Sequence, residues 1–157
     1  MVSPELLRRY PFFAFMTHSQ QQEVAMIADE VEVPANMILF NIEEKAAALY
    51  LLINGSVDLH FVVLDENLPA LRKDFLIGTI NPGDVFSISA MIEPYVLTST
   101  AVTTQPCTVL KIDALALRDL CDQDHDLAYG LQKQLARTTM QRLHATRVLL
   151  AAATAPV

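Results

Sequence analysis

The stretch that decides the fold of this chain is NPGDVFSISAMIEPYVLTSTAVTT, residues 81–104. Pro82 presets the backbone for a turn, and Gly83 accepts the positive φ angle that a tight turn requires. The residues after Phe86 favour the start of a short helix, and the β-branched run that ends at Thr104 favours a strand. This stretch therefore predicts a turn, a short helix, a loop and a strand in immediate succession.

Strand signals extend in both directions from this stretch, over residues 30–113. Short runs rich in β-branched and aromatic residues recur there with turn residues between them. This spacing favours a sandwich or barrel over alternating β/α units. A polar segment, residues 64–74, is predicted to be a loop between two strands. The predicted strands are residues 31–33, 37–40, 49–53, 56–63, 75–80, 98–104 and 108–112.

The dipeptide Asn54-Gly55 is the sharpest local signal in this region. Both residue types tolerate positive φ angles, so the pair is typical of a two-residue hairpin turn between paired strands. After the turn, Val57, Leu59 and Phe61 alternate with polar residues. That alternation predicts one buried and one solvated face for the second strand.

Both flanks of the β region predict helices. Ser3 and Pro4 favour the start of a first helix, and Ser19 is the predicted N-cap of a second helix over residues 20–28. After the strands, Asp113 is predicted to cap a short helix over residues 114–121. The predicted organisation is one α+β domain, 1–157, with helices over 1–29, the β region over 30–113 and helices over 114–151.

The last helix, predicted over residues 126–151, carries apolar residues on two faces. A helix with two apolar faces must cover its own domain and something else besides. We therefore predict a homodimer through this helix and allow for a further protein partner. The candidate dimer residues are Leu127, Leu131, Leu135, Thr138, Arg142 and Leu149.

Bulk composition limits the functions to be expected. Hydrophobic residues make up 52% of the 157 residues, charged residues make up 18%, and the net charge is −7 at pH 7. An acidic chain without clustered Lys and Arg is not predicted to bind nucleic acid directly. No run reaches the ~18 apolar residues of a membrane helix, and no signal-peptide pattern follows Arg9. We expect a cytoplasmic protein with no membrane partner.

Three motifs together resemble the cyclic-nucleotide-binding domain superfamily, and most nearly its bacterial members of the catabolite-activator type. They are LYLLINGSVDL at 49–59, INPGDVFSISAMIE at 80–93 and VLKID at 109–113. The resemblance covers residues 6–150. It implies a double-stranded β-helix, also called a β-roll or jelly roll, with N-terminal helices, a short cassette helix and a long C-terminal helix.

The resemblance also implies where a ligand would bind, and there the sequence departs from the family. Aligned with the family's phosphate-binding cassette, Ser87 stands for a glycine, Ile88 for the ribose-binding glutamate and Leu97 for the phosphate-binding arginine. No Lys or Arg occurs over residues 74–110, so charge-assisted contacts worth ~1.5–3 kcal/mol each are missing there. The pocket candidates are Phe86, Ser87, Ile88, Ser89, Ala90, Leu97, Thr98 and Ser99.

Other donors remain for an anion near the cassette. Main-chain amides at a helix start bind anions without a cation, and Ser and Thr hydroxyls add donors. Arg142 or Arg147 of the last helix is the alternative cation.

These patterns predict a non-enzymatic regulatory or sensor domain with a degenerate cassette. The alternatives are a weak or non-standard cyclic-nucleotide binder and a ligand-free scaffold for dimerisation or docking. A cupin-type metal enzyme is least favoured, because His18, His60, His125 and His144 occur singly and such sites need grouped ligands. We expect no catalytic residues, no metal and no cofactor beyond an unidentified small-molecule ligand. The chain ends soon after the last helix, so no DNA-recognition helix is expected.

Overall fold

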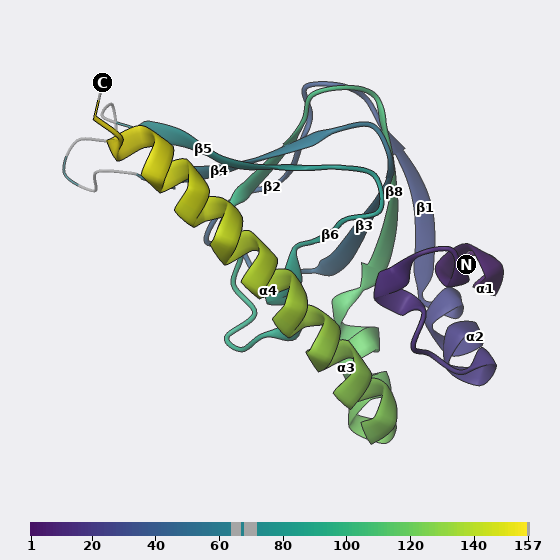
Figure 1. Cartoon of the computed structure of the whole chain (residues 1–157). Helices are drawn as coiled ribbons and strands as arrows, with labels where there is room; N and C mark the ends of the chain where they lie inside the picture. Colours follow the sequence, from purple (N-terminus) through teal and green to yellow (C-terminus); the bar gives the residue numbers. More distant parts are fainter. Residues whose placement is uncertain (64–66, 68–71, 157) are drawn as a thin grey trace.

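The computed structural model describes residues 1–63, 67 and 72–156 (Figure 1). Within these residues the strands form two four-stranded antiparallel sheets. The first sheet has the order β1 (Ala28–Val33), β8 (Cys107–Asp113), β3 (Ala48–Asn54) and β6 (Val85–Phe86). The second sheet has the order β2 (Ile38–Phe40), β7 (Thr100–Thr103), β4 (Val57–Val63) and β5 (Lys73–Ile80). Of the loop predicted over 64–74, residues 64–66 and 68–71 lie outside the described residues, and Lys73 and Asp74 belong to β5.

The chain passes from one sheet to the other at almost every connection, which confirms the predicted double-stranded β-helix. This crossing also corrects the prediction for Asn54-Gly55. Gly55 has the positive φ expected, 105°, but β3 before it and β4 after it lie in different sheets. The dipeptide is therefore a corner between sheets, and the hairpin partner of β4 is β5.

The alternation predicted along β4 breaks halfway. Val57 and Leu59 are buried as predicted, but Phe61 is 45% exposed and Val62 is buried in its place. The register between β4 and β5 shifts between Leu59 and His60. Leu59 pairs with Gly78 and His60 pairs with Leu76, so the extra residue at this shift is Ile77 of β5. A bulge of this kind bends the ladder and increases its local twist.

The first sheet is covered on both faces. Leu49, Leu51 and Leu52 of β3 are all fully buried, as is Leu110 of β8. Because successive side chains of a strand point to opposite faces, burial of neighbours in sequence means that both faces are packed. The second sheet covers one face of the first sheet, and helices contact the strands of the first sheet from its other side.

Three short helical segments precede the strands: α1 (Pro4–Arg8), the 3-10 helix η1 (Pro11–Phe13) and α2 (His18–Met26). Ser3 caps α1 as predicted. The bounds predicted for α2 are wrong by two residues, because Thr17 and Gln20 form a reciprocal capping box and place Ser19 inside the first turn. Ala28 opens β1 instead of closing this helix, since it pairs with Ile112.

Two helices follow the strands: α3 (Ala114–Gln123), capped by Asp113 as predicted, and the long helix α4 (His125–Thr154). Figure 1 shows α4 crossing in front of β6 and extending past the roll towards β4 and β5. A close contact anchors its first half, because a Cβ at Gly130 would lie only 2.1 Å from the Phe15 ring. No helix among the described residues is long and apolar enough to span a membrane.

We predict that Gly55→Ala lowers the free energy of unfolding by about 2 kcal/mol or more. The new Cβ would lie 2.5 Å from Cys107 Sγ and 2.7 Å from the Pro106 carbonyl oxygen, at a residue with positive φ. The matched control is Gly78→Ala on β5, where nothing lies within 4 Å of the new atom, so a change within ~0.5 kcal/mol is expected. Urea unfolding of both variants tests this, and equal effects would contradict it.

Candidate functional site

The candidate site lies where β6 turns into a short 3-10 helix, η2 (Ile88–Met91). Ser87 joins the two elements with a left-handed backbone, φ 61° and ψ 39°. Its buried hydroxyl donates a 2.7 Å hydrogen bond to the carbonyl oxygen of Ala48 on β3. The sharp change from strand to helix therefore rests on one positive-φ residue that is tied to the neighbouring strand.

The predicted pocket residues differ widely in exposure. Phe86, Ala90 and Leu97 belong to the buried core cluster, and Ile88 packs against that cluster. Ser87 is also buried, Ser89 and Ser99 are half-buried, and Thr98 is exposed. The apolar members thus lie together in the interior, while the hydroxyl groups of Thr98 and Ser99 lie nearer the surface.

Leu97 is held firmly in place. Only 4% of the residue is exposed. Its N–H donates to the Glu44 carbonyl oxygen at 2.8 Å, and its own carbonyl oxygen accepts from the Glu43 N–H at 2.8 Å. These two hydrogen bonds pair the loop that carries Leu97 with residues 43–44, and they hold the Leu97 side chain in the core.

Aromatic rings fill the roll between the two sheets beside η2. Phe86 stacks on Tyr50 with ring centroids 5.1 Å apart and an interplanar angle of 16°. Phe40, from the other sheet, lies 6.1 Å from Phe86 and 5.8 Å from Tyr50. Burial raises the pKa of the Tyr50 hydroxyl. Sequence reasoning missed Phe40 and Tyr50 as part of this site, although each occurs in a predicted strand.

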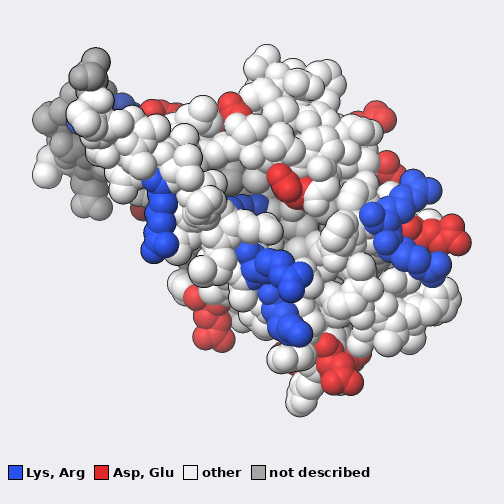
Figure 2. Space-filling model, in the orientation of Figure 1, with Lys and Arg blue, Asp and Glu red and all other residues white. Residues whose placement is uncertain are grey.

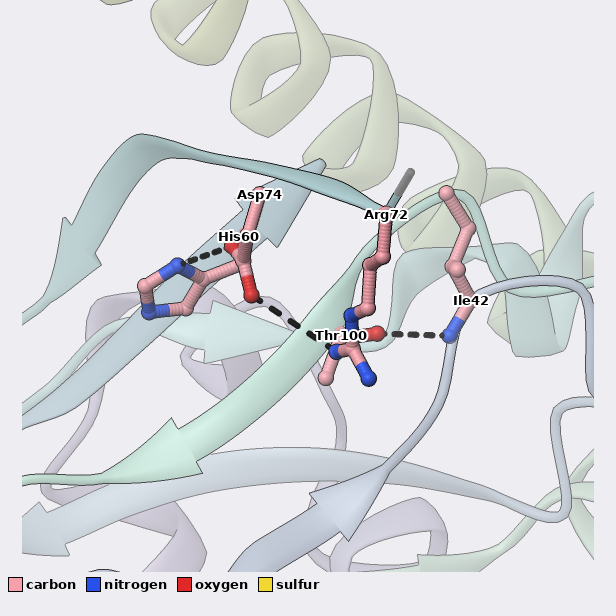
Figure 3. Close-up of polar contacts among 5 residues, drawn as sticks. All are labelled: Ile42, His60, Arg72, Asp74 and Thr100. Atoms are coloured by element: carbon pink, nitrogen blue, oxygen red, sulfur yellow. Dashed lines mark hydrogen bonds and ion pairs between the residues drawn. The ribbon is translucent and has the colours of Figure 1, made fainter. Parts of the chain in front are cut away.

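Figure 3 shows polar contacts on and beside the second sheet. Thr100, which pairs with His60 across β7 and β4, accepts a 2.9 Å hydrogen bond from the Ile42 N–H. His60 Nδ1 lies 2.8 Å from Asp74 Oδ1, without the alignment of a hydrogen bond. Arg72 approaches the other oxygen of the same carboxylate at 3.6 Å. The side chain of His60 is thus directed at a carboxylate across β4 and β5.

Two contacts connect the segment around η2 to the C-terminal helices. Gln132 on α4 donates a 3.5 Å hydrogen bond to the Met91 carbonyl oxygen at the end of η2. Arg118 on α3 lies over the Tyr95 ring, 4.0 Å from its centroid. The segment over residues 88–95 is therefore in direct contact with both α3 and α4.

The face of α4 predicted to dimerise turns largely inward. Leu127, Leu131 and Leu135 are at most 1% exposed and belong to the domain's own core. This corrects their assignment to a dimer contact, because a side chain buried in its own domain cannot meet a second copy. Thr138 and Arg142 continue the same face half-buried, and Leu149 is 48% exposed beyond the roll.

Arg142 reaches from α4 to the strand that leads into the site. Its guanidinium donates to the carbonyl oxygen of Val85 on β6. Burial lowers the pKa of Arg142 to about 10, and the negative charge of Asp84 opposes this shift. Arg142 is thus a cation that the structure brings close to this part of the roll, and its described hydrogen bond is to Val85, which precedes the pocket candidates in the chain.

Among the described residues, no group of three or more His, Cys, Asp or Glu side chains is arranged to hold a metal ion. The donor chemistry of this site is instead that of hydroxyls and main-chain amides beside an apolar cluster. This donor set suits a small-molecule ligand or a packed interior.

The sequence and the fold both match known proteins. Residues 30–124 match the family model described as the cyclic nucleotide-binding domain. A curated relative, the cAMP-activated global transcriptional regulator CRP of Pasteurella multocida (strain Pm70), is 31% identical over 105 residues. The match covers 66% of this chain and 47% of the relative, so this chain spans about half the length of that relative.

Solved structures give the same result. A Geobacter metallireducens GS-15 protein of the cyclic nucleotide-binding type is 33% identical with a TM-score of 0.79, over 92% of this chain and 100% of that chain. The sensor domain of the transcriptional regulator DNR from Pseudomonas aeruginosa is 25% identical with a TM-score of 0.67. That match covers 89% of this chain and 90% of the sensor domain.

We predict that Ser87→Ala lowers the free energy of unfolding by about 1–2 kcal/mol. The variant keeps the positive φ of 61° but loses the hydrogen bond to Ala48. Ser87→Gly loses the same bond and relieves the left-handed backbone, which is worth about 1 kcal/mol, so it is expected to be closer to wild type. Chemical denaturation of the pair tests this, and a glycine variant less stable than the alanine variant would refute it.

Proposed function

Because this chain belongs to the cyclic nucleotide-binding domain family, we propose that it is a non-enzymatic regulatory domain whose cassette is filled by its own apolar side chains. The observation that carries the proposal is the burial of Leu97, 4% exposed, at the position that the family gives to a phosphate-binding arginine. Ile88, at the position of the ribose-binding glutamate, packs against the same core. Two groups that would recognise a cyclic nucleotide are thus replaced by groups that pack.

The electrostatics of the cassette support the same proposal. Residues 74–110 contain no Lys or Arg, and an anion withdrawn from water without a cation forfeits its strongest hydrogen bonds. The ring stack of Phe40, Tyr50 and Phe86 adds apolar volume beside the cassette. A ligand that enters the cassette would have to be weakly charged and be held by Ser89, Thr98 or Ser99.

A regulatory role without catalysis agrees with the known relatives. CRP of Pasteurella multocida and DNR of Pseudomonas aeruginosa are transcriptional regulators. In this chain the contacts of Gln132 with Met91 and of Arg118 with Tyr95 give the cassette a direct mechanical connection to α3 and α4. We propose that the output is the position of these helices, as in two-state switches of this kind.

We further propose that the exposed face of α4 forms a homodimer. Tyr129, Ala136, Leu143 and Leu150 are exposed and recur every seven residues, and Met140, 63% exposed, lies between them. Two helices pack side by side where apolar residues alternate at spacings of three and four, and Ala136, Met140 and Leu143 have this spacing. A protein partner with a similar apolar helix is the alternative occupant of this face.

Adding cyclic AMP, cyclic GMP or a cyclic dinucleotide is expected to leave the melting temperature of the wild-type protein unchanged. A ligand present at about 1,000 times its Kd would add about 4 kcal/mol of stability and raise the melting temperature by several degrees. Thermal-shift titration makes this measurement. A dose-dependent rise with one nucleotide would mean that the amides and hydroxyls of the cassette suffice.

The double variant I88E/L97R is the matched test of the filled cassette. Arg at a position 4% exposed would bury a charge, which costs several kcal/mol when it is unpaired. We expect the variant to melt at a lower temperature than wild type and to gain no affinity for cyclic AMP. Stabilisation of the variant by cyclic AMP would instead show a cassette with room for the nucleotide.

Leu143→Glu is expected to convert the dimer into a monomer, because a carboxylate in the centre of an apolar helix seam is not solvated there. Light scattering at tens of micromolar measures the mass. Gln141→Glu adds the same charge on the same helix outside the seam and is expected to stay dimeric. A wild-type monomer under these conditions would remove the dimer from the proposal.

A further inference from the structure

A groove runs between α4 and the rim of the roll. Its volume is about 390 Å³, within the range of small-molecule sites. Pro11 and Phe12 of η1, Ile80 of β5 and Val85 of β6 provide apolar wall, and α4 provides polar side chains from Gln134 to Arg142. Figure 2 shows basic side chains gathered along α4 on this face, in a molecule whose net charge is −7.

The charge inside the groove comes from arginines of α4. Arg137 and Arg142 both line it, and Asp84 is the single carboxylate among its lining residues. Asp84 is already engaged, because its Oδ2 accepts a 2.9 Å hydrogen bond from the Asn81 N–H and closes the turn before β6. The groove therefore carries a net positive charge.

The Arg142 guanidinium has more N–H donors than its described hydrogen bonds use. A guanidinium has five N–H groups, and the described contacts of Arg142 include one hydrogen bond, to the carbonyl oxygen of Val85. Within the described parts of the chain, no carboxylate lies within 4.0 Å of Arg142. Burial lowers the pKa of this arginine to about 10, which is the response of a cation withdrawn from water without a direct counter-ion. An anion in the groove would supply that counter-ion.

We propose that this groove binds a small organic anion, with a phosphate or carboxylate group on Arg142 and Arg137 and a compact apolar body against Phe12, Ile80 and Val85. Guanidinium groups match both oxyanions in planar, two-point contacts. Thr138, Gln134 and Gln141 line the same groove and provide further hydrogen-bonding groups. The groove is larger than an inorganic ion requires, so its volume favours an organic anion that carries an apolar group.

This site is separate from the cassette. None of the eight cassette candidates lines the groove, so the inference stands whether or not the cassette is filled. The two sites are nevertheless adjacent in the chain, because Val85 immediately precedes Phe86 and Ser87. An anion bridging α4 and β6 would hold the helix against the roll, and it would thereby act on the same helix that the cassette contacts.

The test is calorimetric titration of the full chain with phenyl phosphate, benzoate and inorganic phosphate. We expect phenyl phosphate, benzoate or both to bind saturably and more tightly than inorganic phosphate. The affinities of phenyl phosphate and benzoate together report whether the groove prefers a phosphate or a carboxylate. Arg142→Gln and Arg137→Gln are each expected to weaken binding, Arg142→Gln by at least about tenfold. Arg147→Gln, on the same helix outside the groove lining, is the matched control and is expected to bind as wild type.

The variants also locate the ligand. Arg137 is exposed, so Arg137→Gln tests the site even if Arg142→Gln fails to fold. Thr98→Ala in the cassette is expected to leave phenyl phosphate binding unchanged. If Thr98→Ala abolishes binding while the arginine variants bind as wild type, the anion binds in the cassette. That result would overturn both the proposed anion site in the groove and the proposed filled cassette. If none of the probes binds saturably, the proposed anion site in the groove is overturned and the proposed filled cassette is not.

Discussion

The antiparallel pairing of β3 with β8 is the constraint on which the rest of the molecule depends. These two strands lie at the centre of the first sheet, and their neighbouring leucines are buried on both faces. A sheet buried on both faces needs a second sheet on one side and helices on the other. The helices α1 to α4 are therefore part of the core of this domain, and a movement of α3 or α4 changes contacts with the roll.

The cassette is built on this frame at the end of β6. Ser87 bonds to Ala48 of β3, so the strand that organises the core also holds the turn into η2. Phe86 and Tyr50, paired across β6 and β3, place their rings where the two sheets face each other. Near this support, Leu97 is buried and Ile88 packs against the same core.

The long helix α4 has three different surroundings along its length. Its first half packs into the core through Leu127, Leu131 and Leu135. In its middle, Arg137 and Arg142 border the groove at the rim of the roll. Its outer face and its last turns leave apolar side chains uncovered. One helix thus connects the interior, a cationic groove and an apolar outer surface.

Much of the fold could be predicted from local patterns. The caps at Ser3 and Asp113, the turn at Gly83 and most strands follow from residue type and spacing, because caps and turns depend on a few neighbouring residues. The errors share one cause. The hairpin at Asn54-Gly55, the inward Phe61 and the outward Leu127 were each inferred from a short pattern, whereas their true surroundings depend on segments distant in sequence.

The sequence by itself determined the class of fold, the family and the absence of Lys and Arg over residues 74–110. Only the tertiary structure decided which face of α4 is buried, that Phe40 and Tyr50 stack on Phe86, and that Arg142 reaches β6. The physical reason is that composition and periodicity encode the conformation of a segment. Which side chains meet depends on the register of strands and the path of a helix, and both are set by the packing of the whole core.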